Sequence, residues 1–438
     1  MPEQYMIQGT GAEAIASDVE QAVSTGALTP GAELPPIREL AGRLGVNANT
    51  VAAAYRLLRE RGAVETAGRR GTRVRDRPAT TPRSLRGVAV PPGVRDLSTG
   101  NPDPDLLPIA QLSARPGKPV LYGEPAVSPE LARYARSTLT GDGVAGEHIA
   151  VTAGALDGIE RVLAAHLRPG DRVAVEDPGW ANLLDLLAAL GFSAEPIGVD
   201  DDGPLVADVA FALRRGVRAV LVTTRAQNPT GAAVSALRAK ELRALLIQHD
   251  DVLLIEDDHC AGIAGAPLHP LAGATRHWAF VRSAAKAYGP DLRLALLAGD
   301  RRTVERVQGR LRLGPGWISH LLQDLAVRLW CNKDATRLVQ KAESVYARNR
   351  AALQTALADR GVASSGRSGL NLWIPVPDET VAITRLLSAG WAAAPGARFR
   401  IGSPPGIRIT VSGLAADEIE PLADAVAEAV HAVGRASV

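Results

Sequence analysis

The amino-acid sequence predicts an α/β protein made of a helical N-terminal part and a larger part built on a mostly parallel sheet. Helical periodicity dominates the first seventy or so residues, whereas short apolar runs alternate with amphipathic stretches from about residue 148 onward. A chain of 438 residues is also too long for one compact core, so more than one domain is expected.

The composition indicates an ordinary globular protein, with 46% hydrophobic and 22% charged residues. No apolar run reaches the roughly 18 residues of a membrane span, and the start of the chain, Met1-Pro2-Glu3-Gln4, lacks the pattern of a secretory signal. The two cysteines, Cys260 and Cys331, form neither a disulfide framework nor a metal-binding pattern. We therefore expect a cytoplasmic protein without a bound metal.

Three helices and a hairpin are predicted at the N-terminus. The first helix covers Ala12 to Thr25, where apolar residues share one face. The second opens at Pro35-Pro36, because proline suits a first helical turn, and Asn47 can cap the third. Residues Val64 to Val74 are typical of a β-hairpin with a basic tip.

Positive charge gathers at the end of this region. Residues 56 to 77 hold eight arginines and three acidic residues, an excess of five positive charges in a chain whose net charge is +2. Such asymmetry indicates a polyanionic partner, although a solvated basic face would have the same composition.

The order helix, helix, turn, helix and basic hairpin is that of a winged helix-turn-helix. The segments L-P-P-I-R-E-L-A, L-G-V-N-A-N-T-V and A-Y-R-L-L resemble the GntR-type version of it, in which the third helix enters the DNA major groove. The resemblance implies that Asn47, Asn49, Thr50 and Arg56 face the DNA, Arg38 and Tyr55 reach phosphates, and Arg69 and Arg70 carry the wing. Ala48 stands where relatives commonly have arginine, so base preference is expected to move to Asn47 or Asn49. A purely structural helix-turn-helix is the alternative.

A linker is predicted at residues 77–95, which are rich in proline, glycine, serine and threonine and lack an apolar period. It separates a DNA-binding domain at residues 1–76 from a large domain at residues 96–438.

The large domain begins with alternating strands and helices. Helices are predicted at Leu156 to Leu167 and Ala236 to His249. This alternation predicts a sheet covered by helices on both faces, with sites at the carboxyl ends of its strands. The predicted strands are His148 to Thr152, Arg172 to Glu176, Arg218 to Thr224, Val252 to Asp258, Trp278 to Ser283 and Arg293 to Ala298.

Lys286 follows one of these strands and is expected to face such a site. Desolvation there would lower the pKa of its amine, as a Schiff-base lysine requires. Ser283 and Arg293 supply the hydroxyl and the cation that bind a phosphate, and Gly154-Ala155-Leu156 opens a helix whose N–H groups could do the same. Taken alone, a surface lysine after a buried strand is the alternative.

The pattern S-x-x-K…R resembles the lysine segment of type I aminotransferases, and Asn228-Pro229-Thr230-Gly231 resembles their N-P-T-G turn. The resemblance implies a type I aminotransferase fold with a small C-terminal α+β part, and pyridoxal 5′-phosphate on Lys286. It assigns Asp257 to the ring nitrogen, Asn228 to the phenolic oxygen, Trp180 to the ring face, and Ala155, Leu156, Ser283 and Arg293 to the phosphate. His259 replaces a common tyrosine; it could still bond the phenolic oxygen, with a dependence on pH.

Two further segments extend this resemblance. Tyr122-Gly123-Glu124-Pro125 resembles the Y-G-x-P segment whose tyrosine reaches the phosphate of a neighbouring subunit, which implies a homodimer. Arg408, in Gly406 to Val411, resembles the arginine that grips a ligand carboxylate. A structural ion pair is the alternative for Arg408.

Over nearly its whole length the chain resembles the MocR/GabR-type regulators, with R-A-Q-N-P-T-G and E-D-D-H nearest to members that control vitamin B6 salvage. The resemblance implies a transcriptional regulator that binds operator DNA and senses pyridoxal phosphate, an amine or an amino acid through Lys286. A working aminotransferase with an accessory DNA-binding domain is the alternative. A DNA-binding protein whose large domain only dimerises would not need the full cofactor set.

Overall fold

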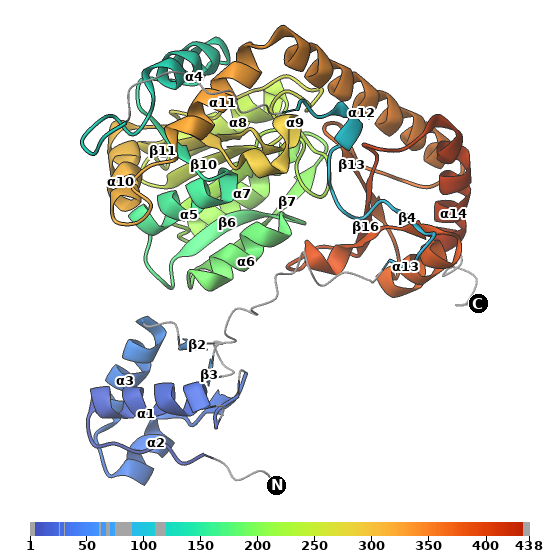
Figure 1. Ribbon diagram of the computed structural model, residues 1–438. Coiled ribbons are helices and arrows are strands. Elements are labelled where there is room, and N and C mark those ends of the chain that lie inside the picture. The colour runs from blue at the N-terminus through green and yellow to red at the C-terminus, as the bar shows by residue number, and fades with distance from the viewer. Residues whose placement is uncertain are drawn as a thin grey trace. The chain divides into compact units, whose positions relative to one another are not determined.

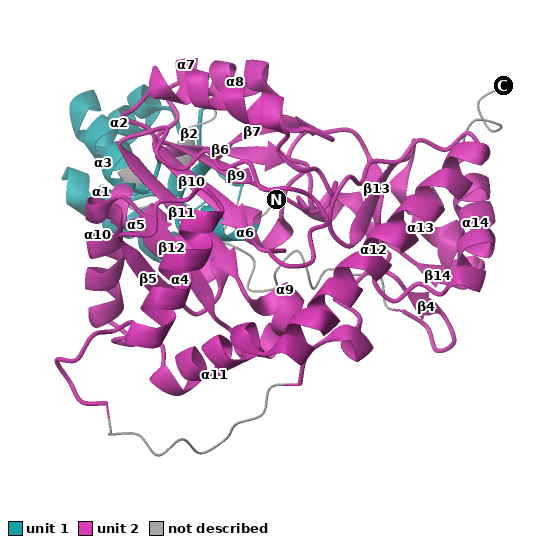
Figure 2. Cartoon of the chain, turned by 90° about the horizontal axis from the view of Figure 1, so that it is seen from above, with its two compact units in different colours: residues 1–82, 167–171, 185–193 teal, residues 83–166, 172–184, 194–438 magenta. Residues whose placement is uncertain are grey.

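A computed structural model describes residues 5–25, 27–29, 31–60, 63–66, 71–74, 90–109 and 120–431. The chain divides into two compact units, which Figure 2 colours separately: residues 1–82 with 167–171 and 185–193, and residues 83–166, 172–184 and 194–438. Within the described part, no helix combines the length and the apolar character needed to cross a bilayer.

The N-terminal region has three helices and a small sheet (Figure 1). The helices are α1 (Ala12–Thr25), α2 (Ile37–Leu44) and α3 (Ala48–Glu60), and the sheet has the antiparallel order β1 (Glu33–Leu34), β3 (Thr72–Val74), β2 (Val64–Thr66). Ile15, Leu40, Val51 and Leu58 are fully buried in one cluster. The predicted winged helix-turn-helix order is confirmed.

Local signals fix the ends of these helices. Gly45 ends α2 in the left-handed region at φ 65°, where glycine costs least. Asn47 accepts a hydrogen bond from the Asn49 backbone N–H at 2.8 Å through Oδ1, as a helix cap does, so the predicted cap is confirmed.

The larger unit holds an eight-stranded sheet in the order β5-β12-β11-β10-β9-β6-β7-β8. Strands β9, β10 and β11 are parallel neighbours, β6 is parallel to β9, and β12 runs antiparallel to both β11 and β5. The strands are β5 (Ile149–Thr152), β6 (Arg172–Asp177), β7 (Ser193–Asp200), β8 (Gly203–Pro204), β9 (Ala219–Thr223), β10 (Leu253–Asp258), β11 (His277–Ser283) and β12 (Ala295–Gly299).

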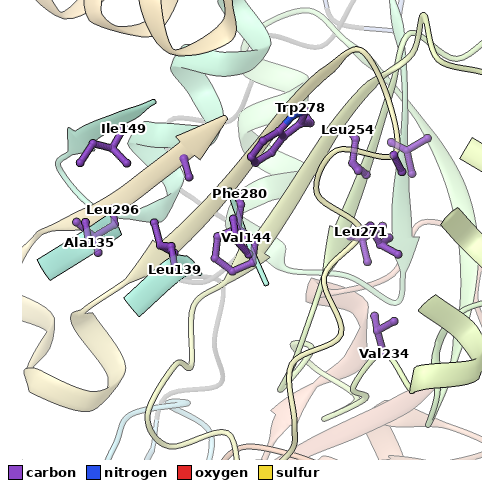
Figure 3. Close-up of a cluster of buried hydrophobic side chains, with 14 of the residues drawn as sticks. Ala135, Leu139, Val144, Ile149, Val234, Leu254, Leu271, Trp278, Phe280 and Leu296 are labelled. Carbon is purple, nitrogen blue, oxygen red and sulfur yellow. The ribbon is translucent and has the colours of Figure 1, made fainter. Parts of the chain in front are cut away.

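Helices cover both faces of this sheet. On one face α4 (Pro129–Gly141), α7 (Val206–Arg214), α8 (Ala236–Ile247) and α11 (His320–Cys331) share a core with strand residues such as Leu254 and Phe280 (Figure 3). On the other face lies α5 (Ala155–His166), whose Gly158 faces Val281 and Leu297 at a distance that leaves little room for a side chain. Two further helices are α6 (Ala181–Ala189) and α10 (Arg301–Arg312). The predicted fold class is confirmed.

The C-terminal part is a smaller α+β body. Its sheet has the antiparallel order β13 (Asn371–Pro375), β16 (Gly406–Thr410), β15 (Ala394–Pro395), and β14 (Trp391–Ala392) pairs with β4 (Arg95–Asp96). Its apolar core joins the sheet to α12 (Lys333–Asp359), α13 (Glu379–Ser388) and α14 (Ile419–His431). The chain therefore contributes to this body from both ends of the large domain.

One carboxylate ties this body to the large sheet. Asp177, the last residue of β6, accepts hydrogen bonds from the backbone N–H groups of Ile401, Gly402 and Ser403 at 2.7–2.9 Å. The Ser403 hydroxyl adds a fourth at 2.7 Å. This joint fixes the segment that precedes β16 relative to the carboxyl end of β6.

Candidate functional site

A pocket of about 470 Å³ lies at the carboxyl ends of the parallel strands, within the larger unit. That volume suits a small ligand. It brings together most of the predicted cofactor residues with others from the C-terminal body. The lining includes Gly154, Ala155, Leu156, Trp180, Asn228, His259, Cys260, Ser283, Lys286, Arg293, Arg398 and Arg408, with residues 98–101.

Lys286 lies in the short helix α9 (Ala285–Tyr288), directly after β11. Its Nζ donates a 2.6 Å hydrogen bond to the Gly100 carbonyl. Burial lowers the pKa of this amine and the nearby Arg408 lowers it further, against an opposite effect of Cys260. The lysine is thus half-buried, pocket-facing and easier to deprotonate than a surface amine.

Four of the pocket residues are suited to binding a phosphate: Ala155, Leu156, Ser283 and Arg293. Gly154 has φ 96° and leads into α5. Ala155 and Leu156, the first residues of α5, line the pocket, so the free N–H groups of this helix N-terminus can bind an anion there. Ser283 ends β11 and is buried. Arg293 donates to the Ala153 carbonyl at 3.2 Å, and its guanidinium lies close over Gly154.

The antiparallel strand β12 explains how Arg293 gets there. Arg293 precedes β12, and because β12 runs against β11, its beginning lies at the edge where β11 ends. Arg293 itself has φ 44°, the left-handed conformation that turns the chain from the 3-10 helix Pro290–Leu292 into the strand.

Arg408, in β16, also lines the pocket. Its Nη1 donates to Asn228 Oδ1 at 2.9 Å, its Nη2 donates to the Ser98 carbonyl, and its guanidinium carbon lies 5.0 Å from the Phe399 ring centre. Burial and the nearby Arg398 lower the pKa of Arg408 to about 9, against an opposite effect of Asp96. Its buried Nε has no hydrogen-bond partner among the described residues. Within the same residues, Arg408 forms no ion pair with a carboxylate.

Asp257 is the next-to-last residue of β10, lies behind the pocket lining and is 2% exposed. Its Oδ2 is 3.1 Å from His259 Nδ1, and its buried Oδ1 has no partner among the described residues. Burial alone would lower the pKa of His259, but Cys260 and the Asp257 carboxylate outweigh it and raise that pKa well above its ordinary value. The site therefore holds an acceptor oxygen that lacks a donor among the described residues.

Trp180 completes the wall beside His259. The two rings are nearly parallel, with an interplanar angle of 20° and centres 6.4 Å apart. Both line the pocket, so a flat ring entering it would meet an aromatic surface.

Tyr122 is not in this pocket. It is 93% exposed and packs edge-on against Trp317, with ring centres 5.6 Å apart. A separate hollow includes both residues together with Arg133 and Arg136.

Several pocket residues were not predicted from the sequence. Gly100 and Ser98 follow β4, and Arg398 and Phe399 lie between β15 and β16, so they come from segments without a strand-end signal. Cys260, which follows His259, is buried and lines the pocket. Its position next to the E-D-D-H segment was the only signal available.

A buried ion-pair network supports the same edge of the sheet. Asp258, the last residue of β10, pairs with Arg225 at 2.9 Å and with Arg282 at 2.8 Å, and Arg282 also pairs with Asp142 at 2.6 Å. Opposite charges hold the pKa of Asp258 below its ordinary value despite burial. The paired Asp258 is thus structural, in contrast to its neighbour Asp257.

At the N-terminal domain, Arg38, Asn47, Asn49 and Arg56 are exposed and Thr50 is half-buried, as DNA contacts require. The expectation for Tyr55 is wrong. Its ring is 3% exposed, and its hydroxyl donates to the Pro35 carbonyl at 2.7 Å, so this hydroxyl fastens α3 to the start of α2. The predicted wing residues Arg69 and Arg70 lie outside the described residues.

Two family models match the chain in the order that the fold indicates. The model for bacterial regulatory proteins of the gntR family matches residues 11–74, and that for aminotransferase class I and II matches residues 97–426. The chain belongs to the aminotransferase class I and II family and, with its GntR-type domain, is a transcriptional regulator of the MocR type.

Two curated transcriptional regulators are similar in sequence to this chain. The vitamin B6 salvage pathway transcriptional repressor PtsJ of Salmonella typhimurium is 41% identical over 97% of this chain and 100% of its own length. The pyridoxine biosynthesis transcriptional regulator PdxR of Corynebacterium glutamicum is 32% identical over 59% of this chain and 58% of its own.

Among solved structures, a multiple substrate aminotransferase of Thermococcus profundus has a TM-score of 0.70 at 20% identity, covering 79% of this chain and 93% of the other. A kynurenine aminotransferase of Pyrococcus horikoshii has a TM-score of 0.69 at 20% identity, covering 78% and 91%. This likeness concerns the fold of the large domain.

Proposed function

We propose that this regulator binds pyridoxal 5′-phosphate in the pocket around Lys286 and that the occupant of this pocket controls its affinity for operator DNA. One observation carries the proposal: the half-buried Lys286 amine lines the pocket, and behind the lining the buried Oδ1 of Asp257 has no partner among the described residues. These are the two groups that an aldehyde and a protonated ring nitrogen require.

The remaining residues fit the same cofactor. The N-terminus of α5, Ser283 and Arg293 would hold the phosphate, and Trp180 would face the ring. The Asn228 carbonyl oxygen is taken by Arg408, so its amide nitrogen is the group left to donate to the phenolic oxygen. When bound, pyridoxal phosphate supplies an aldehyde that reacts with amines and a ring that accepts electrons.

The proposed effector is pyridoxal phosphate itself or an amine or amino acid that displaces Lys286. A carboxylate would meet Arg408, which is buried and has no acidic partner among the described ion pairs. Since the relatives are named for vitamin B6 salvage and pyridoxine biosynthesis, we propose operators near genes for vitamin B6 supply.

For DNA, we propose that Asn49, Thr50 and Arg56 of α3 enter the major groove and that Arg38, with Arg69 and Arg70 of the wing, contacts phosphates. We also propose a homodimer in which Tyr122 reaches the phosphate bound by the other subunit. The exposure of Tyr122 and of its neighbour Leu121 supports this arrangement.

The test is reconstitution of the full chain with pyridoxal phosphate. Wild type should gain a visible absorbance band that borohydride bleaches with covalent retention of the cofactor. Lys286→Ala should lose the band, whereas Lys240→Ala, which changes a lysine on α8 outside the pocket, should keep it. A bleachable band in Lys286→Ala, or none in wild type, would refute cofactor binding at this site.

Operator binding then distinguishes a sensor from an enzyme. Apo, cofactor-bound and amine-treated protein should differ in operator affinity by about 1–3 kcal/mol, the usual coupling range. Steady-state transamination over a panel of amino acids should be slow. Equal operator affinity in all three states, together with fast turnover on one amino acid, would instead favour the aminotransferase with an accessory DNA-binding domain.

A further inference from the structure

His259 occupies an unexpected position in the pocket. The sequence suggested a contact with the phenolic oxygen of the cofactor, yet Nδ1 of His259 faces the Asp257 carboxylate, 3.1 Å from Oδ2. At that distance Nδ1–H donates to the carboxylate, which fixes the tautomer or protonation state with a proton on Nδ1. His259 therefore bonds to the acid behind the pocket wall.

The imidazole ring is held on a second side by Trp180. Ring centres 6.4 Å apart with an angle of 20° lie within the range of direct aromatic pairs. The hydrogen bond and this packing together restrict how His259 can turn.

The consequence falls on Asp257. Its Oδ2 is engaged by His259, so the carboxylate plane is fixed and Oδ1 is the oxygen that remains for a donor. Glu176, itself buried, accepts from Thr223 and Gln227, and Oδ1 of Asp257 has no hydrogen bond to it or to any other described residue. Without His259 the carboxylate would be free to rotate or to share its two oxygens.

We propose that His259 is a positioning residue for Asp257, holding Oδ2 so that Oδ1 meets the ring nitrogen of the bound cofactor. The inference rests on the proposed function, because it assumes that this cofactor enters the pocket. It removes His259 from the phenolic oxygen and leaves that contact to Asn228. The chain thus uses its histidine to orient the acid behind the ring.

The test compares variants that keep or lose the Nδ1 donor. In His259→Asn the side-chain amide nitrogen can take the place of Nδ1, whereas His259→Phe keeps a ring without a donor. Pyridoxal phosphate is titrated into each full-length apoprotein, with the visible absorbance and circular dichroism band recorded at each step. The dichroism reports how the bound ring is oriented, which a general loss of stability would not change.

The chain offers a matched control in His277. Its Nδ1 bonds Asp300 at 3.3 Å, but neither residue lines the pocket. We expect His259→Phe to weaken cofactor binding about tenfold, as loss of a hydrogen bond to a charged group does, and to alter the dichroism. His259→Asn should stay near wild type in both, and His277→Phe should bind as wild type does.

Each result decides the matter. Weaker binding by His259→Asn with wild-type binding by His259→Phe would mean that ring shape matters and not the hydrogen bond. Equal weakening of both variants would contradict the proposal, because the retained donor would not restore binding, and wild-type behaviour of both would remove His259 from the site. If His259→Phe does not fold, His259→Ser, whose hydroxyl is too short to reach Asp257, replaces it. Absence of binding by wild type would instead refute the proposed function, and this inference with it.

Discussion

Arg408 and Asn228 share a 2.9 Å hydrogen bond that joins β16 of the C-terminal body to the turn after β9. The same guanidinium also donates to the Ser98 carbonyl and lies against Gly100. Three separate segments thus contact the Arg408 guanidinium. An anion bound to this guanidinium would therefore act on Asn228, the residue proposed to donate to the cofactor's phenolic oxygen.

Replacing Arg408 should therefore separate two kinds of ligand. In Arg408→Met, affinity for amino acids should fall about tenfold or more, because a charge-assisted bidentate contact is lost. Affinity for pyridoxal phosphate should fall less, since its phosphate is proposed to bind Arg293, Ser283 and the N-terminus of α5 and not Arg408. Spectral titration measures both, with Arg276→Met, an exposed arginine paired to Asp250, as the control. Equal losses for both ligands would contradict the proposed division of the pocket.

Gly100→Ala tests the packing on that guanidinium. Gly100 has φ 69°, and an added Cβ would lie 3.1–3.2 Å from the Arg408 guanidinium. Gly93→Ala is the control: at φ 84° its left-handed backbone should likewise destabilise the folded state by about 1–2 kcal/mol, but its added Cβ would meet no atom within 4 Å. We expect both variants to lose stability in thermal unfolding and only Gly100→Ala to lose amino-acid affinity. A similar affinity in both variants would show that Arg408 moves aside freely.

Glu256 should make stability fall as the pH rises. Burial raises its pKa from 4.5 to about 8, and its Oε2 has no partner among the described residues. A raised folded-state pKa means that the folded protein binds the proton more tightly, so the stabilisation is full below pH 4.5 and is lost toward pH 8. Glu256→Gln should gain about 2 kcal/mol relative to wild type between pH 5 and pH 7 in urea unfolding. The exposed Glu305→Gln should show no such trend, and a flat difference for Glu256→Gln would contradict the prediction.

In the N-terminal domain, Tyr55 and Arg56 are neighbours with opposite predicted roles. Tyr55→Phe should lower stability by about 1 kcal/mol through loss of the bond to Pro35 and leave operator affinity nearly unchanged. Arg56→Ala should leave stability nearly unchanged and weaken operator binding, with a reduced salt dependence. Fluorescence anisotropy at several salt concentrations distinguishes the two, and a loss of affinity in Tyr55→Phe alone would reverse the assignment.

Asn49→Ala should change which base is preferred, at about 1–3 kcal/mol for a bidentate contact. Binding to a set of single-base operator variants measures this preference. A uniform loss on every variant would make Asn49 a phosphate contact.

The sequence predicted the fold more fully than the site. The limits of α1, the Asn47 cap and the strand before Lys286 follow from local periodicity and turn chemistry, and these were confirmed. The burial of Tyr55 could not be read locally, because its partner Pro35 lies twenty residues away. The strand β7 was missed, since its alternation of buried and exposed residues is weak.

The pocket depends on longer-range geometry. An antiparallel β12 cannot be told from a parallel one by its own residues, although its direction brings Arg293 to the edge where β11 ends and to the pocket that Lys286 also lines. The contacts of Arg408 and His259 join segments that periodicity does not relate. Their residue types were predicted, but their partners required the folded chain.

Hydrogen exchange at the Asp177 contacts can measure how often the large sheet and the C-terminal body separate. Three consecutive amides, at Ile401, Gly402 and Ser403, are protected by one carboxylate, so an opening event that frees one of them exposes all three. Their deuterium uptake should then follow a single rate, set by how often the two bodies part. A ligand that contacts both Arg408 and Lys286 should slow that shared rate, so the exchange of these three amides would report ligand binding between the large sheet and the C-terminal body.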